Sequence, residues 1–203
     1  MSGVRRLVLA TRNAHKRREF ARLLADGHEN AAIELLALPD ALELPPEDGD
    51  TFAENALVKA RAAAEGGGHV AIADDSGIEA DALGGAPGVR SARYAGEHAS
   101  DGENLSKLLR EAPAGSGLRY VCALAYVDAE RRVERTFEGR CSGRLADAPR
   151  GTNGFGYDPA FVPDEQSGEL TMAELSDESK DAISHRGRAA RALLEWLQQV
   201  DGG

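Results

Sequence analysis

Short apolar runs and helical apolar stripes alternate along much of the chain, and this pattern predicts an α/β fold. The runs expected to form strands are Leu7–Ala10, Ile33–Leu38, Val70–Ala73, Ile78–Leu83, Leu118–Val127 and Arg132–Arg140. The segments expected to form helices begin after Asn13, at Thr51, at Ser100, at Ser176 and near Ser184. The last two strands are expected to form a hairpin through the turn Asp128–Arg131.

The composition is that of a globular protein able to bury a large core. The chain has 203 residues, of which 42% are hydrophobic, enough for one large domain or two closely packed lobes. Its apolar runs fall far short of a membrane span, and Leu7–Ala10 is too short for a secretory signal, so we expect a cytoplasmic protein. The two cysteines, Cys122 and Cys141, match no metal or redox spacing and are expected to be reduced structural thiols.

Acidic residues outnumber basic ones overall, but not near the N-terminus. The formal net charge of −10 argues against binding to nucleic acid or to an anionic membrane surface. Residues 1–22, in contrast, hold seven Lys or Arg against a single acid, Glu19. Because exposed charges are screened beyond about 8 Å at physiological salt, we expect this segment to attract an anion locally.

Asp74 and Asp75 directly follow a predicted strand and are the strongest chemical signal. Ser76 and Gly77 are expected to turn the chain, which would leave a carboxylate at the strand end, where open α/β sheets place their ligand sites. Carboxylates in this setting suit Mg²⁺ or Mn²⁺ shared with a substrate phosphate. The alternative is an ordinary turn. The glycine-rich stretch 83–89 favours a ligand site, although a flexible linker would share that composition.

A second signal lies between the first predicted strand and the first predicted helix. The segment Thr11–Lys16 follows the apolar run, and Asn13 is a good helix N-cap. Backbone N–H groups and Lys16 would then form a phosphate cradle, although the same residues also suit a plain helix start with an exposed lysine. Neither GxxxxGK[ST] nor GxGxxG occurs, so P-loop and Rossmann sites are not supported.

Glu54 has two competing interpretations. Thr51 and Glu54 have the spacing of a capping box, in which the glutamate accepts a hydrogen bond from the Thr51 backbone. The alternative is a metal ligand that faces Asp75. The spacing alone favours the cap.

The glycine-rich segment Gly151–Pro159 suits recognition of a nucleotide base. Its glycines surround Phe155, which suits a loop that stacks this ring on a flat ligand while Asp158 meets a polar edge. The alternative is a glycine-rich turn in which Phe155 and Tyr157 are buried anchors.

The C-terminal segment places cations at the start of predicted helices. Ser176 is expected to cap a short helical turn that carries Lys180. His185 and Arg186 open the last predicted helix, where cations are unfavourable unless an anion or acceptor compensates. This placement favours a functional role for the pair.

Together these stretches resemble the inosine/xanthosine triphosphate pyrophosphatase family, which acts on noncanonical purine nucleoside triphosphates. The matching stretches, in order, are LVLATRNAHK (7–16), TFAENALVKA (51–60), AIADDSGIEADALGGAPGVRSARYAGE (71–97), GTNGFGYDPAF (151–161) and ELSDESKDAISHRGRA (174–189). They span almost the whole chain. The resemblance implies one pyrophosphatase domain over residues 1–203, an α/β fold with a long mixed central sheet, flanking helices and two lobes around an active cleft, usually as a homodimer.

The resemblance also implies a reaction and a set of site residues. The reaction is hydrolysis of ITP, dITP or XTP to the monophosphate and pyrophosphate, with Mg²⁺ or, as the alternative, Mn²⁺ as the metal ion. Asp75 would be the general base and a metal ligand, with Glu54 as the other metal carboxylate. The residues implied to hold the phosphates or contact the substrate are Thr11, Arg12, Asn13, Ala14, His15, Lys16, Ser76 and Lys180. Those implied to hold the base are Phe155, Gly156, Tyr157, Asp158, His185 and Arg186.

Two residues depart from the family pattern, and three rival functions stay open. Arg12 and Asn153 stand where family members often have glycine. Arg12 is expected to add a phosphate contact or narrow the entrance, and Asn153 to stiffen the base loop. The rivals are a pyrophosphatase for another modified nucleotide, a nucleotide sensor without turnover, and a phosphatase that forms an aspartyl-phosphate.

Overall fold

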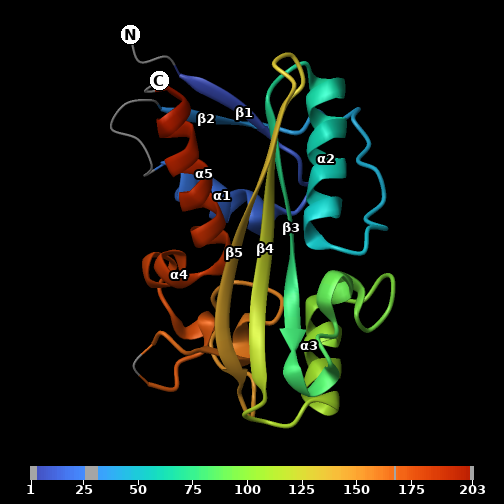
Figure 1. The fold of residues 1–203 in the computed structure, drawn as a ribbon. Coiled ribbons are helices and arrows are strands. Elements are labelled where there is room, and N and C mark those ends of the chain that lie inside the picture. The colour runs from blue at the N-terminus through green and yellow to red at the C-terminus, as the bar shows by residue number, and fades with distance from the viewer. Residues whose placement is uncertain (1–3, 26–31, 167, 202–203) are drawn as a thin grey trace. The chain divides into compact units, whose positions relative to one another are not determined.

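The computed structural model describes residues 4–25, 32–166 and 168–201, and its central feature is a mixed β-sheet (Figure 1). The strand order is β2-β1-β3-β4-β5-β6. The strands are β1 (Arg5–Leu9), β2 (Ile33–Ala37), β3 (Ala71–Ala80), β4 (Gly117–Asp128), β5 (Val133–Leu145) and β6 (Phe161–Pro163). β1 pairs in parallel with both β2 and β3, whereas β5 and β6 are antiparallel, so the expected mixed sheet is confirmed.

The helices begin where the capping residues predict. They are α1 (Ala14–Ala25), α2 (Phe52–Gly67), α3 (Asp101–Glu111), α4 (Asp177–Ile183) and α5 (His185–Asp201). Ser100 and Ser176 cap α3 and α4 by accepting hydrogen bonds from Glu103 N–H and Ser179 N–H. These side chains satisfy backbone donors that a helix start leaves unpaired, which is why the boundaries could be predicted from sequence.

The chain divides into two compact units. Unit 1 comprises Met1–Asp75, Cys122–Gly139 and Arg186–Gly203, and unit 2 comprises Ser76–Val121 and Arg140–His185. The boundary therefore separates Asp75 from Ser76 and His185 from Arg186. Two neighbouring pairs of candidate site residues are divided between the units.

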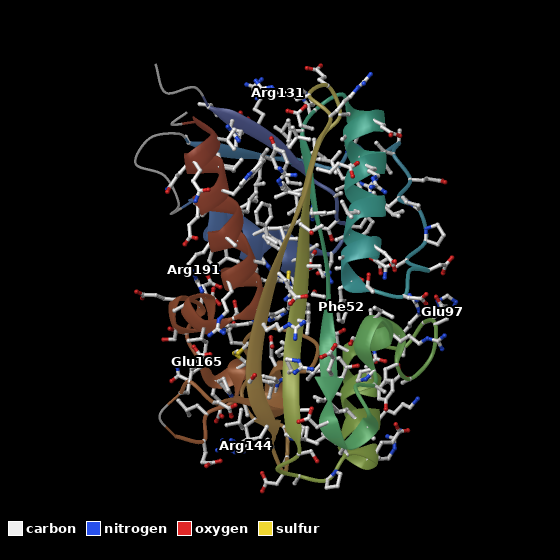
Figure 2. The ribbon with its side chains drawn as sticks, viewed as in Figure 1. Phe52, Glu97, Arg131, Arg144, Glu165 and Arg191 are labelled. Atoms are coloured by element: carbon white, nitrogen blue, oxygen red, sulfur yellow. The ribbon has the colours of Figure 1, made fainter. Side chains whose placement is uncertain are left out.

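In unit 1, helices cover both faces of the sheet (Figure 1). α1 and α5 lie on one face, where Phe20 and Leu193 belong to the same buried cluster as Leu7 and Ile72. α2 lies on the other face and buries a row of small side chains, Ala56, Ala60, Ala63 and Ala64. Figure 2 labels Phe52, the buried first residue of α2. Small residues let the α2 backbone lie close to the sheet.

The hairpin of unit 1 forms where the sequence predicts it. β4 and β5 are joined by a short turn, at which Figure 2 labels Arg131. The Arg131 backbone N–H donates to the Asp128 carboxylate at 3.0 Å. Arg132 has a positive φ of 56°. The Asp128 carboxylate fixes the turn by accepting a local backbone hydrogen bond.

In unit 2, a separate core forms where α3 packs against the strand segments of this unit. Its buried members include Ile78, Leu108, Tyr120, Phe161 and Met172. Cys141 lies in this core and Cys122 in the core of unit 1, and both cysteines are buried and unbridged. The expectation of structural thiols is therefore confirmed.

The structure corrects the expected turn after Asp74 and Asp75. β3 continues without a break through Ser76 and Gly77, so these residues do not turn the chain. The parallel partner β1 ends at Leu9, which pairs opposite Ile72 of β3. The two carboxylates therefore lie just beyond the end of a neighbouring strand, and strand pairing rather than local sequence sets their position.

Other strands also differ from the prediction. The run expected as a strand at Ile78–Leu83 ends as a strand at Ala80, and Asp81–Leu83 forms a short 3₁₀ helix. β5 extends to Leu145, and β6 was not predicted. In the described part of the chain, no helix combines the length and apolar character needed to cross a bilayer.

Phe20 offers a test of the unit 1 core. Its side chain is 0% exposed, so Phe20→Ala is expected to lower the free energy of unfolding by about 3–5 kcal/mol through lost burial and a residual cavity. Urea unfolding followed by circular dichroism measures this change. Val4, which is 60% exposed, is the control, since Val4→Ala should change stability by less than about 0.5 kcal/mol. A Phe20→Ala protein as stable as the wild type would contradict the described core.

Candidate active site

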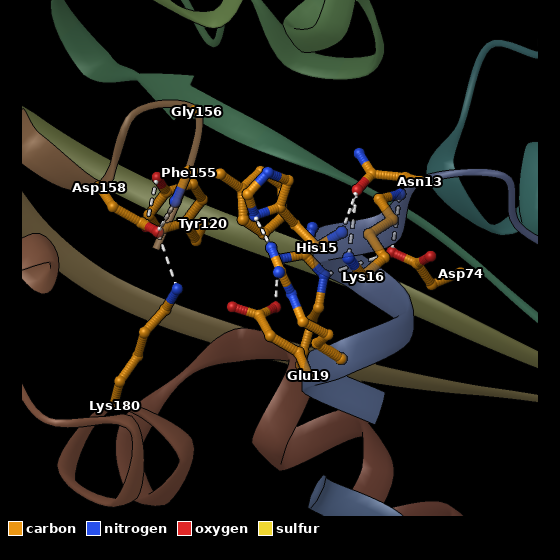
Figure 3. Close-up of polar contacts among 12 residues, drawn as sticks. Asn13, His15, Lys16, Glu19, Asp74, Tyr120, Phe155, Gly156, Asp158 and Lys180 are labelled. Carbon is orange, nitrogen blue, oxygen red and sulfur yellow. Dashed lines mark hydrogen bonds and ion pairs between the residues drawn. The ribbon is translucent and has the colours of Figure 1, made fainter. Parts of the chain in front are cut away.

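The segment Thr11–Lys16 of unit 1 joins β1 to α1 and is shaped by Asn13. The Asn13 Oδ1 accepts hydrogen bonds from the backbone N–H groups of His15 at 2.9 Å and Lys16 at 3.2 Å (Figure 3). Thr11 Oγ1 accepts from the Asn13 N–H at 3.2 Å. The predicted N-cap is thus confirmed, and the positive end of α1 follows directly on a parallel strand, an arrangement suited to an anion.

Two other residues of this segment are also placed. Ala14 is the exposed first residue of α1. The ring of His15 is exposed, and its Nδ1 lies 2.9 Å from Arg18 Nη2. Both residues therefore lie at the surface of the first turn of α1.

Asp74 is the centre of a buried ionic cluster in unit 1. Its side chain is 0% exposed, and its Oδ2 lies 2.9 Å from Lys16 Nζ and 3.5 Å from Arg186 Nε (Figure 3 shows the Lys16 contact). Burial alone would raise the pKa of Asp74, but the charges of Lys16, Arg186 and Lys59 outweigh it and hold the pKa well below its usual value. Asp74 is therefore a carboxylate across the physiological range.

Arg186 is held by a second acid. Its Nη1 donates to Glu19 Oε2 at 2.9 Å, and both side chains are only 8% exposed. Glu19 of α1 and Asp74 of β3 therefore compensate the charge of Arg186 at this helix start, and a functional role for Arg186 stays a prediction. The sequence did not identify Glu19 as that partner, since it lies far away in the chain.

Asp75 lies on the opposite side of β3 from Asp74 because successive strand residues point to opposite faces. Asp75 Oδ2 accepts a hydrogen bond from Asn55 Nδ2 of α2 at 2.9 Å, and Asn55 Oδ1 in turn accepts from the Gly49 N–H at 2.8 Å. Burial raises the pKa of Asp75, while the charge of Lys59 opposes this shift. A carboxylate with a raised pKa is suited to accept a proton from water near neutral pH.

Lys59 supports both acids from α2. Its Nζ donates to the Asp74 backbone oxygen at 2.6 Å and pairs with the Glu47 carboxylate. Burial by itself would lower the pKa of Lys59, but the negative charges of Asp74, Glu47 and Asp75 together raise this pKa by a larger amount. The net shift of the pKa is upward, so the ammonium stays charged. Asn55 and Lys59 are four residues apart and share one helix face. The other buried residues of α2 are mostly alanines, so this polar pair stands out in the sequence. The predicted set of site residues did not include it.

Glu54 forms the cap that its spacing favoured, and Glu47, which was not among the predicted site residues, acts on Asp75. Glu54 is exposed, and its Oε2 accepts from the Thr51 N–H at 3.1 Å while Thr51 Oγ1 accepts from the Glu54 N–H at 3.2 Å. The capping box is therefore confirmed. Glu47 is the carboxylate that acts electrostatically on Asp75, raising its pKa. Within the described ranges, no three His, Cys, Asp or Glu side chains form a metal-binding group by themselves.

In unit 2, Asp158 organises the loop predicted to hold a base. Asp158 Oδ1 accepts from Tyr120 OH at 3.0 Å, and Oδ2 accepts from the Phe155 N–H at 2.9 Å and from Lys180 Nζ at 2.7 Å (Figure 3). Gly154 has a φ of 75°, and a Cβ there would lie 2.1 Å from Asp158 Oδ2. A side chain at position 154 would therefore displace the carboxylate.

Two further residues of the loop, Gly156 and Tyr157, fix it to other segments of unit 2. The Gly156 N–H donates to Asp101 Oδ2 of α3 at 2.9 Å, and the buried Tyr157 donates its hydroxyl to the Ser91 carbonyl at 2.8 Å. Tyr157 is thus a buried anchor, as the alternative interpretation had it, whereas Phe155 is only partly buried. The Lys180 ammonium lies 5.6 Å from the centre of the Phe155 ring.

Asn153 links this loop to the segment that leads into α4. Its Nδ2 donates to the Leu175 carbonyl at 2.9 Å and to Asp177 Oδ1 at 3.1 Å, while its Oδ1 accepts from the Gly154 N–H at 2.9 Å. Glycine could make none of these side-chain contacts. The contacts account for the expected stiffening of the loop.

His185 and Ser76 complete the unit 2 candidates. The His185 ring is buried and stacks on Tyr120 with centroids 4.5 Å apart and an interplanar angle of 7°. Through Tyr120 it lies next to the Asp158–Lys180 pair. Ser76 is partly buried on β3, immediately after Asp75.

Comparisons with known proteins identify close relatives along the whole chain. A family model described as the Ham1 family matches residues 7–196. A dITP/XTP pyrophosphatase from Cutibacterium acnes is 48% identical over 193 residues, covering 93% of this chain and 94% of the relative. A dITP/XTP pyrophosphatase from Geobacillus kaustophilus is 47% identical, with 98% of each chain covered.

Solved structures show the same fold. A HAM1 protein from Coxiella burnetii matches with a TM-score of 0.84 and 38% identity, covering 97% of this chain and 100% of that protein. A nucleoside-triphosphatase/dITP/XTP pyrophosphatase from Mycobacterium abscessus matches with a TM-score of 0.70 and 44% identity, covering 93% and 98%.

The Asp74 cluster predicts a large loss of stability on neutralisation. Asp74→Asn removes the charge that compensates Lys16 and one of the two acids that hold Arg186, so we expect the free energy of unfolding to fall by about 3–5 kcal/mol. Urea unfolding in the presence of EDTA measures this. The control is Glu34→Gln, which breaks an exposed pair with Arg6 and should cost less than about 1 kcal/mol.

The difference in unfolding free energy between the wild type and Asp74→Asn should depend on pH. Because the folded pKa of Asp74 lies below its unfolded value of about 4, its stabilisation is complete above that value and is lost as the pH falls towards the folded pKa. The difference between wild type and Asp74→Asn should therefore be constant near neutral pH and shrink below about pH 4. A difference that grows on acidification would contradict the assignment.

Proposed function

The chain belongs to the Ham1 family, and we propose that it hydrolyses noncanonical purine nucleoside triphosphates, such as ITP, dITP and XTP, to the monophosphate and pyrophosphate. The observation that carries this proposal is the pair of adjacent acids in unit 1: Asp74 is held ionised by Lys16, and Asp75 is buried with a raised pKa. The names of the relatives, dITP/XTP pyrophosphatase, support the substrate class.

We propose that the segment Thr11–Lys16 holds the triphosphate. The N-terminus of α1 places a partial positive charge directly after β1, and Lys16 adds a full charge at the same place. Asp74 fixes the Lys16 ammonium at 2.9 Å. Asp74 is thus proposed to orient Lys16 rather than to react.

Asp75 is proposed as the general base. Water that attacks the α-phosphorus must lose a proton as the bond to the pyrophosphate group breaks, and Asp75 would orient that water and accept its proton. Asn55 holds one carboxylate oxygen of Asp75, and Lys59 keeps its pKa from rising further. This arrangement leaves the general base oriented and able to ionise.

The donor set fits a hard divalent cation. Glu47 pairs with Lys59, and its charge acts on Asp75, so both carboxylates lie near the Lys59 ammonium. Mg²⁺ is commonly bound by one or two carboxylates together with substrate phosphates and water. Bound there, Mg²⁺, or Mn²⁺, would offset charge that develops on the leaving pyrophosphate. We therefore propose Glu47 with Asp75, and retain Glu54 as the competing second carboxylate.

Unit 2 is proposed to recognise the base. Phe155 would stack on the purine, and His185, which stacks on Tyr120, would favour a 6-oxo acceptor over the 6-amino group of adenine. Lys180 was expected to hold a phosphate, but because its ammonium pairs with Asp158 of the base loop we propose that it acts at the base instead.

Arg186 was also expected to contact the base. Its guanidinium pairs with Glu19 and Asp74, so a contact with the base stays a prediction. We also propose a homodimer that acts in the cytoplasm, which the resemblance supports.

The reaction is tested with ITP and Mg²⁺ in ¹⁸O-labelled water, with ATP assayed in parallel. We expect IMP and pyrophosphate as products, little ATP turnover, and the label in the IMP phosphate, because water attacks the α-phosphorus. Label in the pyrophosphate would contradict that point of attack. Unlabelled IDP together with labelled inorganic phosphate would favour the aspartyl-phosphate rival, in which no water oxygen enters the nucleotide product. Turnover of another modified nucleotide but not ITP would favour the nearest enzymatic rival.

Asp75→Asn separates the enzyme from a sensor. We expect turnover to fall by about 10²–10⁴-fold because the proton acceptor is lost, while ITP binding measured by calorimetry is retained. Asp147→Asn, at a carboxylate that is 84% exposed, is the matched control and should keep wild-type turnover. An Asp75→Asn protein with undiminished turnover would exclude Asp75 as the base.

A second pair of variants tests the metal carboxylate. Glu47→Gln should raise the Mg²⁺ concentration for half-maximal activity by about 10-fold or more, whereas Glu54→Gln should weaken only the α2 cap, at about 1 kcal/mol. Mg²⁺ titration of initial rates, together with thermal unfolding, distinguishes the two effects. If Glu54→Gln raised the Mg²⁺ requirement and Glu47→Gln did not, Glu54 would be the second metal carboxylate.

A further inference from the structure

Arg12 binds a run of backbone carbonyls in unit 1. Its Nη1 donates to the Leu38 oxygen at 3.1 Å, and its Nη2 donates to the oxygens of Pro39 at 2.7 Å, Asp40 at 3.2 Å and Leu42 at 2.9 Å. Four carbonyls of one short segment therefore converge on a single guanidinium. The planar fork of arginine can donate to several acceptors at once, which an ammonium cannot match in geometry.

Charge contributes little to this contact. The carboxylate of Asp40 lies 3.6 Å from Arg12 Nη1, but it is fully solvent-exposed and the arginine side chain is 48% exposed. Ion pairs at such exposure contribute little because solvent screens them. The carbonyl hydrogen bonds are therefore what hold Arg12 in place, and they hold the segment 38–42 against the segment Thr11–Lys16.

The bound segment leads directly to the groups around Asp75. Five residues after Leu42, the Glu47 carboxylate pairs with Lys59. Two residues further on, the Gly49 N–H donates to the Asn55 amide, whose other end donates to Asp75. A Cβ at Gly49 would lie 2.7 Å from Asn55 Oδ1, so this stretch fits closely against α2. Arg12 thus fixes one end of a segment whose other end orients the general base.

We propose that Arg12 is a positioning residue that sets the segment 38–49, and with it Glu47 and Asn55, relative to the phosphate-binding segment. This replaces the expectation that Arg12 contacts a phosphate, and it rests on the proposed function. Its loss should disturb the carboxylates that serve the metal more than it disturbs the affinity for nucleotide.

The test uses Arg12→Ala and Arg12→Lys. Arg6→Ala is the control, because Arg6 lies on β1 and forms an exposed pair with Glu34 of β2. For both Arg12 variants we expect the Mg²⁺ concentration for half-maximal ITP hydrolysis to rise by about 10-fold, as outer residues of metal sites typically show. Arg12→Lys should not restore the wild-type Mg²⁺ requirement, since lysine keeps the positive charge but lacks the planar guanidinium that binds the four carbonyls. A rise in KM for ITP alone, fully rescued by Arg12→Lys, would overturn the proposal in favour of a phosphate contact.

Hydrogen exchange provides a readout independent of activity. The Leu42 N–H donates to the Pro39 oxygen at 3.1 Å, and the Gly49 N–H donates to Asn55. Both amides should exchange about 10-fold faster in Arg12→Ala than in wild type or Arg6→Ala, because local opening becomes easier. Unchanged exchange would overturn the proposal. Absence of ITP hydrolysis by the wild type would instead refute the proposed function, and the exchange result would still decide the role of Arg12.

Discussion

The buried carboxylate of Asp74 is the interaction on which the candidate site of unit 1 depends. It draws Lys16 from α1 and Arg186 from α5 to one oxygen, while its backbone oxygen accepts from Lys59 of α2. Three helices are therefore tied to β3 at one residue. A buried ion cluster of this kind is stable only when each charge is compensated, and Glu19 supplies the second negative charge for Arg186.

Alternation along β3 lets two adjacent, chemically identical side chains have opposite properties. Asp74 faces α1 and α5, where cations hold its pKa low, while Asp75 faces α2, where burial raises its pKa and Asn55 fixes one oxygen. One residue can then hold the cations in place while its neighbour exchanges protons. Asp158 has the organising role in unit 2, where it binds Tyr120, the Phe155 N–H and Lys180.

Local sequence patterns correctly predicted the features that depend on residues close together in the chain. The caps at Asn13, Thr51, Ser100 and Ser176, and the hairpin turn, depend on residues within three or four positions of each other, and the structure confirms each of them. The turn at Ser76 and Gly77 was wrong because pairing with distant strands kept β3 extended.

Contacts across the chain explain what else was missed in the candidate site. Glu47 reaches Lys59 from a loop, Glu19 reaches Arg186 from 167 residues away, and Lys180 pairs with Asp158. None of these partners has a fixed spacing that a sequence pattern could reveal. The types of residue in the site were therefore predictable, whereas their pairing depended on the folded sheet.

The Arg12 contact has a consequence for how this region can diverge. Its acceptors are the main-chain oxygens of residues 38, 39, 40 and 42, and every amino acid carries such an oxygen. Side chains in that segment can therefore change while the contact persists, provided that the backbone path is kept. No matching substitution is required in the partner, so correlated changes between aligned sequences would leave this link undetected.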